Sequence, residues 1–197
     1  MKIFILACGQ QDRFKQCTKQ LLKVDGETLL DRMIRLCKPH KPTIVTWKPE
    51  LEGLDVDYHF FDERNCVLNT LKSTRQLWHH KNIVLLGDVM YTEDSMKRIL
   101  ECDKDLCFFT DINDIFAFVF TGNYPGDMAY HLSRCIDINK NEVVTRFRHL
   151  FAYFGSRWDS LELICDETQD FDQDFEYDEF LEGKSKNRLF NLMKTYK

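Results

Sequence analysis

The chain has 197 residues, 44% hydrophobic and 13% aromatic, which predicts one domain with its own core. Its net charge of −5, from 27 basic and 32 acidic residues, argues against a nucleic-acid partner. Eight cysteines without a Cys-x-x-Cys pair favour reduced thiols in a cytoplasmic protein, and no apolar run is long enough to predict insertion into a membrane.

The strongest pattern lies in the first forty residues. An apolar strand is predicted at 2–7, a polar loop at 10–20 and a helix at 28–36. A nearly continuous apolar strand is typical of a parallel sheet covered on both faces, and ligands of such sheets bind outside the carboxyl ends of the strands. We therefore expect a ligand at the loop.

The composition of this loop suits a polyphosphate. Gly9 lets the backbone approach a ligand closely, and three cationic side chains follow it, those of Arg13, Lys15 and Lys19. The pattern predicts a loop that binds nucleotide phosphates. A glycine turn with basic residues is equally typical of an ordinary connection on a solvated face, and that alternative stays open.

The same stretch resembles the opening signature of the nucleotidyltransferases that make activated sugars and alcohols, which have a GT-A-like, Rossmann-type domain. The residues that carry the resemblance are Leu6-Ala7-Cys8-Gly9, Arg13-Phe14, Lys19-Gln20-Leu21-Leu22, Gly26 and Leu29-Leu30-Asp31-Arg32. The chain departs from the family pattern where Gln11 replaces a second glycine, Asp12 a small hydroxyl residue and Thr18 a proline.

The resemblance implies roles for several of these residues. Arg13 and Lys19 would act in catalysis by offsetting charge on a nucleoside triphosphate and on the leaving pyrophosphate. The nucleotide base would be received by the backbone of the first strand's end, at Leu6, Ala7, Cys8 and Gly9.

Two more short strands, at 43–47 and 57–61, and a helix at 65–78 continue the alternation expected of βαβ units. In the resembled family the turn that opens this helix touches the base or the acceptor. Asn69, Thr70 and Ser73 occupy comparable places. The alternative is that Asn65 or Asn69 only caps the helix.

The second strong element is a hydrophobic strand that ends in Gly87-Asp88, followed by a helix at 92–100 with a hydroxyl cap. Asp88 at the end of a central strand should face the loop of Arg13 and Lys19. Magnesium takes few carboxylates and shares its other positions with phosphate and water, so Asp88 suits a metal ligand. The resemblance assigns the same role, and an aspartate in a simple turn is the alternative.

Residues 101–150 are less informative. Strands are predicted at 105–110 and 115–120 and a helix at 124–135. The resemblance implies that this region builds the acceptor pocket, where Phe116, His131 and Tyr153 could contact the acceptor. Single aromatic and histidine residues are more often part of a core or a surface.

An acidic segment near the C-terminus contains Asp170, Asp172 and then Glu176 on an amphipathic helix. Alternation along an extended strand puts Asp170 and Asp172 on the same side, so both could reach one cation. The resemblance implies that this pair returns to the nucleotide site and completes the magnesium coordination. The alternative is an acidic solvated turn that caps a helix.

Together these elements predict a single-domain three-layer α/β/α sandwich with a mostly parallel mixed sheet. We expect a nucleotide-binding half at about 1–104 and an acceptor-binding half at about 105–197. The resemblance implies a Mg²⁺-dependent nucleotidyltransferase that moves a nucleoside monophosphate from a nucleoside triphosphate to a phosphorylated small-molecule acceptor, foremost a sugar 1-phosphate, and releases pyrophosphate.

Three alternatives stay open. They are a cytidylyltransferase for an alcohol phosphate or an acidic sugar, a glycosyltransferase that uses a nucleotide sugar, and a non-catalytic nucleotide-binding domain. By analogy with short chains of this type, a homodimer is also expected.

Overall fold

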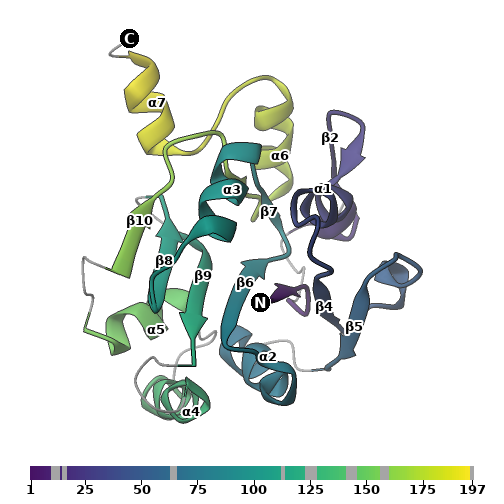
Figure 1. Ribbon diagram of the computed structural model, residues 1–197. Coiled ribbons are helices and arrows are strands. Elements are labelled where there is room, and N and C mark those ends of the chain that lie inside the picture. Colours follow the sequence, from purple (N-terminus) through teal and green to yellow (C-terminus); the bar gives the residue numbers. More distant parts are fainter. Residues whose placement is uncertain are drawn as a thin grey trace.

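The computed structural model describes residues 1–9, 14, 17–62, 66–111, 114–122, 128–140, 146–155 and 160–195. Its centre is a seven-stranded sheet of order β10-β8-β9-β6-β1-β4-β5 (Figure 1). In this sheet β9 is antiparallel to both of its neighbours, and the other pairs are parallel. The predicted mostly parallel mixed sheet is confirmed. The strands are β1 (Lys2–Leu6), β4 (Thr43–Thr46), β5 (Asp57–Phe60), β6 (Lys81–Leu86), β8 (Leu106–Thr110), β9 (Ile115–Thr121) and β10 (Leu161–Leu163).

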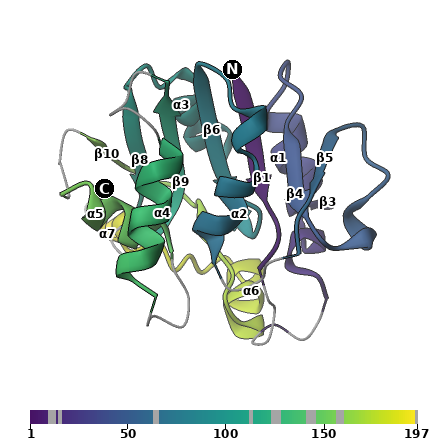
Figure 2. The ribbon, with the colours of Figure 1, turned by 90° about the horizontal axis from the view of Figure 1, so that it is seen from below.

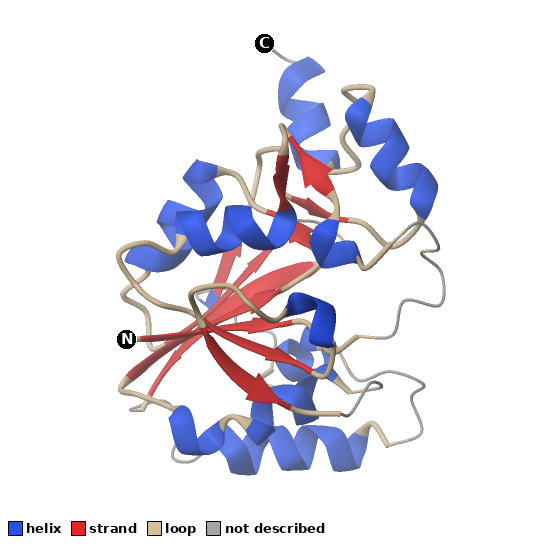
Figure 3. Ribbon diagram, turned by 90° about the vertical axis from the view of Figure 1, so that its right-hand side faces the viewer, coloured by secondary structure: helices blue, strands red, loops and turns tan. Residues whose placement is uncertain are grey.

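Helices cover both faces of the sheet, as Figure 3 shows. The side chains of Ile3 and Ile5 pack in one core cluster with residues of α1 (Leu29–Leu36) and α3 (Glu93–Glu101). The intervening Phe4 packs in a second cluster, on the opposite face. Because successive residues of a strand point to opposite faces, the apolar run of β1 fills both cores. The helices of the second face are α2 (Val67–Ser73), α4 (Met128–Ile138) and α5 (Phe147–Tyr153).

Two small ribbons lie outside the main sheet. β2 (Lys23–Val24) and β3 (Glu27–Thr28) form a hairpin whose turn has positive φ at Asp25 and Gly26, the conformation of a tight two-residue turn. β7 (Val89–Met90) pairs antiparallel with β11 (Gln169–Asp170). The second ribbon joins the C-terminal acidic segment to the strand end that carries Asp88.

The C-terminal segment adds α6 (Asp174–Leu181) and α7 (Arg188–Thr195). Figure 2 shows α6 beyond the carboxyl end of β1, at the edge of the sheet where a ligand was expected. The predicted helix after Asp172 is confirmed. None of the helices among the described residues is long and apolar enough to span a membrane.

The predicted helix at 65–78 is shorter than expected. α2 ends at Ser73, and a separate 3-10 turn follows at Arg75–Leu77. At this break the Thr74 hydroxyl donates to the Leu71 carbonyl at 2.7 Å and accepts from the Trp78 indole at 2.9 Å. The Cys66 thiol caps α2 by accepting from the Asn69 amide, so the alternative interpretation of Asn69 as the cap is wrong. Asn65 lies outside the described residues.

All eight cysteines are free, and Cys102, which directly follows α3, is the one expected to be the most reactive. A hydrogen bond with Cys107, the Lys104 amide and the charges of Lys81 and Lys104 together lower the pKa of Cys102, against the effect of burial. We expect iodoacetamide to alkylate this half-buried thiol at a lower pH than an ordinary cysteine, because the thiolate is the nucleophile.

Peptide mapping of alkylated protein over a pH series measures this. Burial raises the pKa of Cys8 and of Cys135 to about 11, so their peptides serve as internal references that stay unmodified. A Cys102 peptide that reacts only in the alkaline range of an ordinary thiol would contradict the prediction.

Candidate active site

The carboxyl ends of three parallel strands meet at one edge of the sheet. β4 and β6 both pair with β1: Leu6 at the end of β1 is in register with Leu86 at the end of β6 and with Val45, one residue before the end of β4. Backbone bonds continue just beyond the strands, from the Ala7 amide to the Val45 carbonyl at 2.8 Å and from the Gly87 amide to the Leu6 carbonyl at 3.0 Å. The segment Gly87-Asp88 is thereby fixed against the end of β1.

Gly87 is required for this close approach. A Cβ at Gly87 would lie 2.9 Å from the Leu6 carbonyl oxygen and 3.2 Å from the Ala7 Cβ, distances at which the two strand ends must separate. We expect Gly87→Ala to lower the free energy of unfolding by about 1–3 kcal/mol. Denaturant unfolding measures this, with Gly122→Ala as the control because its Cβ would meet its nearest atom at 3.9 Å. Equal stability of the two variants would contradict the prediction.

Lys19 brings together two carboxylates from distant parts of the chain. Its ammonium lies 3.5 Å from Asp88 Oδ2 and 3.4 Å from Asp172 Oδ1. The lysine side chain is buried, whereas the side chains of Asp88 and Asp172 are 31% and 30% exposed. The first loop, the end of β6 and the segment after β11 therefore meet at one point, with both carboxylates open to solvent.

The first loop itself is described only in part. Phe14 is buried in the core, and the Lys19 ammonium lies 6.0 Å from the centre of its ring. The predicted catalytic Arg13 lies outside the described residues, as do Gln11 and Asp12.

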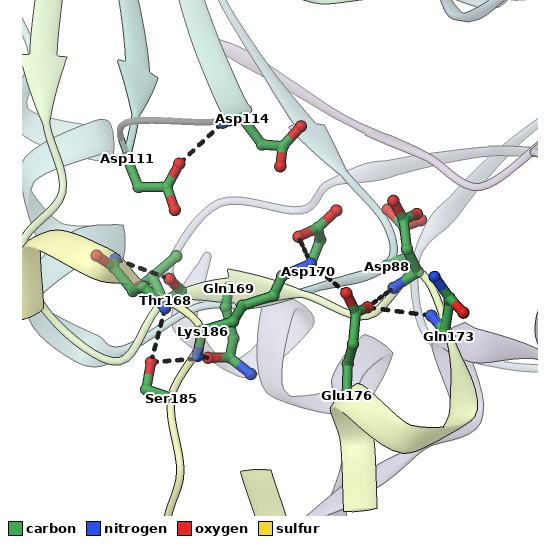
Figure 4. Close-up of polar contacts among 12 residues, drawn as sticks. Asp88, Asp111, Asp114, Thr168, Gln169, Asp170, Gln173, Glu176, Ser185 and Lys186 are labelled. Atoms are coloured by element: carbon green, nitrogen blue, oxygen red, sulfur yellow. Dashed lines mark hydrogen bonds and ion pairs between the residues drawn. The ribbon is translucent and has the colours of Figure 1, made fainter. Parts of the chain in front are cut away.

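Asp170 has a different partner from Asp172. Its Oδ1 forms an ion pair of 2.6 Å with the ammonium of Lys186 (Figure 4). Burial raises the pKa of Asp170 to about 7; the charge of Lys186 opposes this shift, and the nearby carboxylates of Asp88 and Asp114 add to it. Asp170 is therefore turned toward Lys186, while Asp172 faces Lys19.

Glu176 lies in the first turn of α6 and ties it to the segment before it. One carboxylate oxygen, Oε2, accepts from the Asp172 amide at 2.5 Å and from the Gln173 amide at 3.0 Å (Figure 4). The other, Oε1, lies 3.4 Å from the Lys186 ammonium. Glu176 thus caps the helix, and the cap also fixes the backbone of Asp172.

The residues expected to receive the base lie around the end of β1. The Cys8 thiol donates to the Val45 carbonyl at 3.4 Å and to the Phe61 carbonyl at 3.2 Å, and the Trp47 indole donates to the Cys8 carbonyl at 2.9 Å. On α2 the Thr70 hydroxyl donates to the Cys66 carbonyl at 3.3 Å. Leu6, Ala7 and Cys8 are buried, Gly9 is exposed, and Asn69 lies beside Thr70 at the start of α2.

Two lysines at this edge were not predicted as site residues. Lys48 is the second residue after β4, is 3% exposed and contacts Gln20 Oε1 at 3.3 Å. Burial lowers its pKa, and the charge of Asp88 opposes that effect. Because Lys48 follows a parallel strand, the rule that selected Asp88 could also have selected it. Lys186 had no such signal, since it lies in a polar segment between α6 and α7.

The residues that were expected to contact the acceptor do not lie together. Phe116 is 1% exposed and packs in the core, which is the alternative that the sequence left open for this residue. His131 and Tyr153 contact each other at 3.2 Å across α4 and α5. Closer to the site, the turn after β8 carries Asp114, whose amide donates to Asp111 Oδ1 at 2.8 Å, and burial raises the pKa of Asp114.

The carboxylates fit a magnesium ion that is shared with substrate. Among the described residues, no group of three or more His, Cys, Asp or Glu side chains is arranged to hold a metal ion. Asp88 and Asp172 are two partly exposed carboxylates directed at a common cation, the Lys19 ammonium. Magnesium is usually bound by one or two carboxylates together with water and substrate phosphates. Asp88 and Asp172 can supply the two carboxylates and leave the other positions to water and substrate.

Comparison with known proteins places the chain in a family. The MobA-like NTP transferase domain matches residues 3–150. No curated protein sequence matches the chain.

Several solved structures share the fold. A candidate glucose-1-phosphate thymidylyltransferase from Bacillus anthracis is 12% identical with a TM-score of 0.63, covering 97% of this chain and 99% of its own. The inositol-1-phosphate CTP transferase from T. maritima is 12% identical with a TM-score of 0.58, covering 88% and 90%. Molybdopterin-guanine dinucleotide biosynthesis protein A from Archaeoglobus fulgidus is 11% identical with a TM-score of 0.53, covering 83% of each chain. Because the family match extends over most of its length, this chain belongs to the MobA-like NTP transferase domain family and is a nucleotidyltransferase.

Proposed function

We propose that this protein is a Mg²⁺-dependent enzyme that transfers a nucleoside monophosphate from a nucleoside triphosphate to a phosphorylated acceptor, foremost a sugar 1-phosphate, with release of pyrophosphate. The observation that supports this most directly is the convergence of Lys19, Asp88 and Asp172 at the carboxyl edge of β1 and β6. That edge is where open α/β sheets bind their ligands.

In the proposed reaction a phosphate oxygen of the acceptor attacks the α-phosphorus in line. The new phosphorus–oxygen bond forms as the bond to the bridging oxygen of the β-phosphate breaks, and pyrophosphate leaves with that electron pair. Such a transfer needs mainly positioning and compensation of charge. Asp88 and Asp172 would hold magnesium, which when bound would offset negative charge on the α-phosphate.

The remaining residues bind and orient the substrates in this proposal. Lys19, with Arg13 of the first loop, would offset charge on the triphosphate and on pyrophosphate. The backbone of Ala7 to Gly9 and the start of α2 at Asn69 and Thr70 would receive the nucleoside. Asp170 is assigned to the metal site only indirectly, because its carboxylate is paired with Lys186.

The acceptor class rests on the structural relatives. Two of them are named for transfer to glucose 1-phosphate and to inositol 1-phosphate, both phosphorylated polyhydroxy compounds. The half of the chain after about residue 104 would bind the acceptor, and the Asp111 and Asp114 turn offers carboxylates for its hydroxyl groups. A cytoplasmic location and pairing into a homodimer stay predictions.

The test is pyrophosphate release with Mg²⁺, measured across the four nucleoside triphosphates with a panel of sugar 1-phosphates and phosphocholine. We expect release that needs both one triphosphate and a sugar 1-phosphate. Release with CTP and phosphocholine alone would instead support the cytidylyltransferase alternative. No release, with nucleotide binding intact by calorimetry, would contradict the proposal and favour a glycosyltransferase or a binding domain.

A further inference from the structure

Lys186 lies at the centre of an ion-pair cluster next to the carboxylate pair. Its ammonium is 2.6 Å from Asp170 Oδ1 and 3.4 Å from Glu176 Oε1, and all three side chains are less than a third exposed (Figure 4). Burial acts to lower the pKa of Lys186, but the charges of Asp170, Glu176 and Asp172 raise it, and the net shift is upward. The ammonium therefore stays charged at neutral pH.

The backbone that carries Lys186 is fixed to the small ribbon beside Asp88. Gln169 Oε1 accepts from the Lys186 amide at 2.9 Å and from the Ser185 hydroxyl at 2.7 Å. The side-chain amide of the buried Asn187 donates to the Thr168 carbonyl at 3.2 Å. Since Gln169 pairs with Met90 in the β7–β11 ribbon, the position of Lys186 is set relative to the strand end of Asp88.

Through Glu176 this cluster reaches Asp172. Oε1 of Glu176 contacts Lys186, and Oε2 accepts the amide of Asp172. The Lys186 charge thus holds the glutamate in the orientation that binds the backbone of Asp172, while the Asp172 carboxylate remains directed at Lys19. Groups that orient metal ligands without touching the metal commonly set its affinity.

We infer that Lys186 is a positioning residue that, through Glu176, presets the Asp172 carboxylate opposite Asp88 for a divalent cation. The inference rests on the proposed function, because it concerns the metal centre of that reaction. It extends the part of the C-terminal segment in the active site from Asp172 to Lys186, both of which lie beyond the residues 3–150 that match the family.

The test measures Mn²⁺ binding to the full chain in two ways, by calorimetry and by the electron paramagnetic resonance signal of free Mn²⁺. We expect Lys186→Gln to bind Mn²⁺ about ten- to a hundredfold more weakly than the wild type. Lys186→Arg should recover most of the affinity, because it keeps the charge. The matched control is Lys184→Gln, two residues away, whose exposed side chain pairs only with the exposed Glu182 among the contacts described.

A second measurement needs no metal. We expect the amide hydrogen of Asp172 to exchange faster in Lys186→Gln than in Lys184→Gln, because its acceptor Glu176 is no longer held by the lysine. Glu176→Gln provides a variant that retains an acceptor for this amide but loses the charge facing Lys186. It should therefore also weaken Mn²⁺ binding, even if Lys186→Gln does not fold.

The outcomes separate this inference from the proposed function. Unchanged Mn²⁺ affinity in Lys186→Gln or Glu176→Gln, with unchanged exchange at Asp172, would overturn the positioning role even if the wild type releases pyrophosphate. A wild type that does not bind Mn²⁺ would overturn it too. A wild type that binds Mn²⁺ with the expected variant effects but releases no pyrophosphate would contradict the proposed reaction and leave the positioning role supported.

Discussion

Asp88→Asn is expected to lower the rate of pyrophosphate release by about three orders of magnitude or more while the protein stays folded. The asparagine keeps the size of the side chain but removes the charge that would hold the metal next to Lys19. The fold should tolerate the change because the Asp88 side chain is 31% exposed and follows β6 rather than packing in the core. Steady-state pyrophosphate release and circular dichroism measure the two parts of this expectation.

The matched control is Asp103→Asn. Asp103 is an exposed aspartate that follows α3, and its replacement should leave turnover at the wild-type level. Near-normal turnover of a folded Asp88→Asn variant would remove Asp88 from the metal site and leave the two-carboxylate centre without support.

Lys19→Met is expected to lower kcat by about a hundred- to a thousandfold, the usual effect of removing one group that stabilises charge in a transition state. The methionine retains the apolar stem, which is buried next to Phe14, but leaves the carboxylates of Asp88 and Asp172 without the ammonium between them. Since this charge is proposed to act on the triphosphate, the KM for the triphosphate should also rise. Initial rates over a range of triphosphate concentrations separate the two effects.

Lys23→Met serves as its control, because Lys23 is an exposed lysine on the neighbouring hairpin. We expect this variant to keep the kinetic constants of the wild type. A loss of less than tenfold in Lys19→Met would show that the ammonium only neutralises the two carboxylates and has no part in the transfer.

The sheet could be predicted because its strands are nearly continuous apolar runs. The side chains of Ile3 and Phe4 enter opposite cores, so the pattern that predicted a doubly covered parallel strand is the pattern that builds it. The same logic located Asp88, since the carboxyl end of a central parallel strand is a place where ligands bind. These inferences depend only on local sequence and a general rule of sheet topology.

It could not be predicted that Asp170 and Asp172 have different partners. Alternation placed both on one side of an extended strand, but β11 ends at Asp170 and the backbone of Asp172 is held instead by Glu176. The decisive partner, Lys186, comes from a segment whose approach depends on tertiary contacts. No spacing of residues in the sequence predicts such a contact.

The cap of α2 and the helical conformation of α5 could not be predicted from the sequence either. The cap of α2 is the Cys66 thiol, a residue type without a strong preference for that position, so only asparagines had been considered as the alternative. The apolar segment around Leu150 forms α5 because its buried side chains pack on the second core cluster. Short apolar runs do not distinguish a strand from a helix until their neighbours are known.

The central claim is that Asp88 and Asp172 hold one cation for one reaction. It is tested most directly by comparing pyrophosphate release, at saturating Mg²⁺, in Asp88→Asn, Asp172→Asn and the double variant. If both carboxylates serve the same ion, the double variant should lose no more activity than the more damaged single variant, because the first substitution already removes the ion. Losses that multiply in the double variant would contradict a shared metal centre and show that the two aspartates act independently.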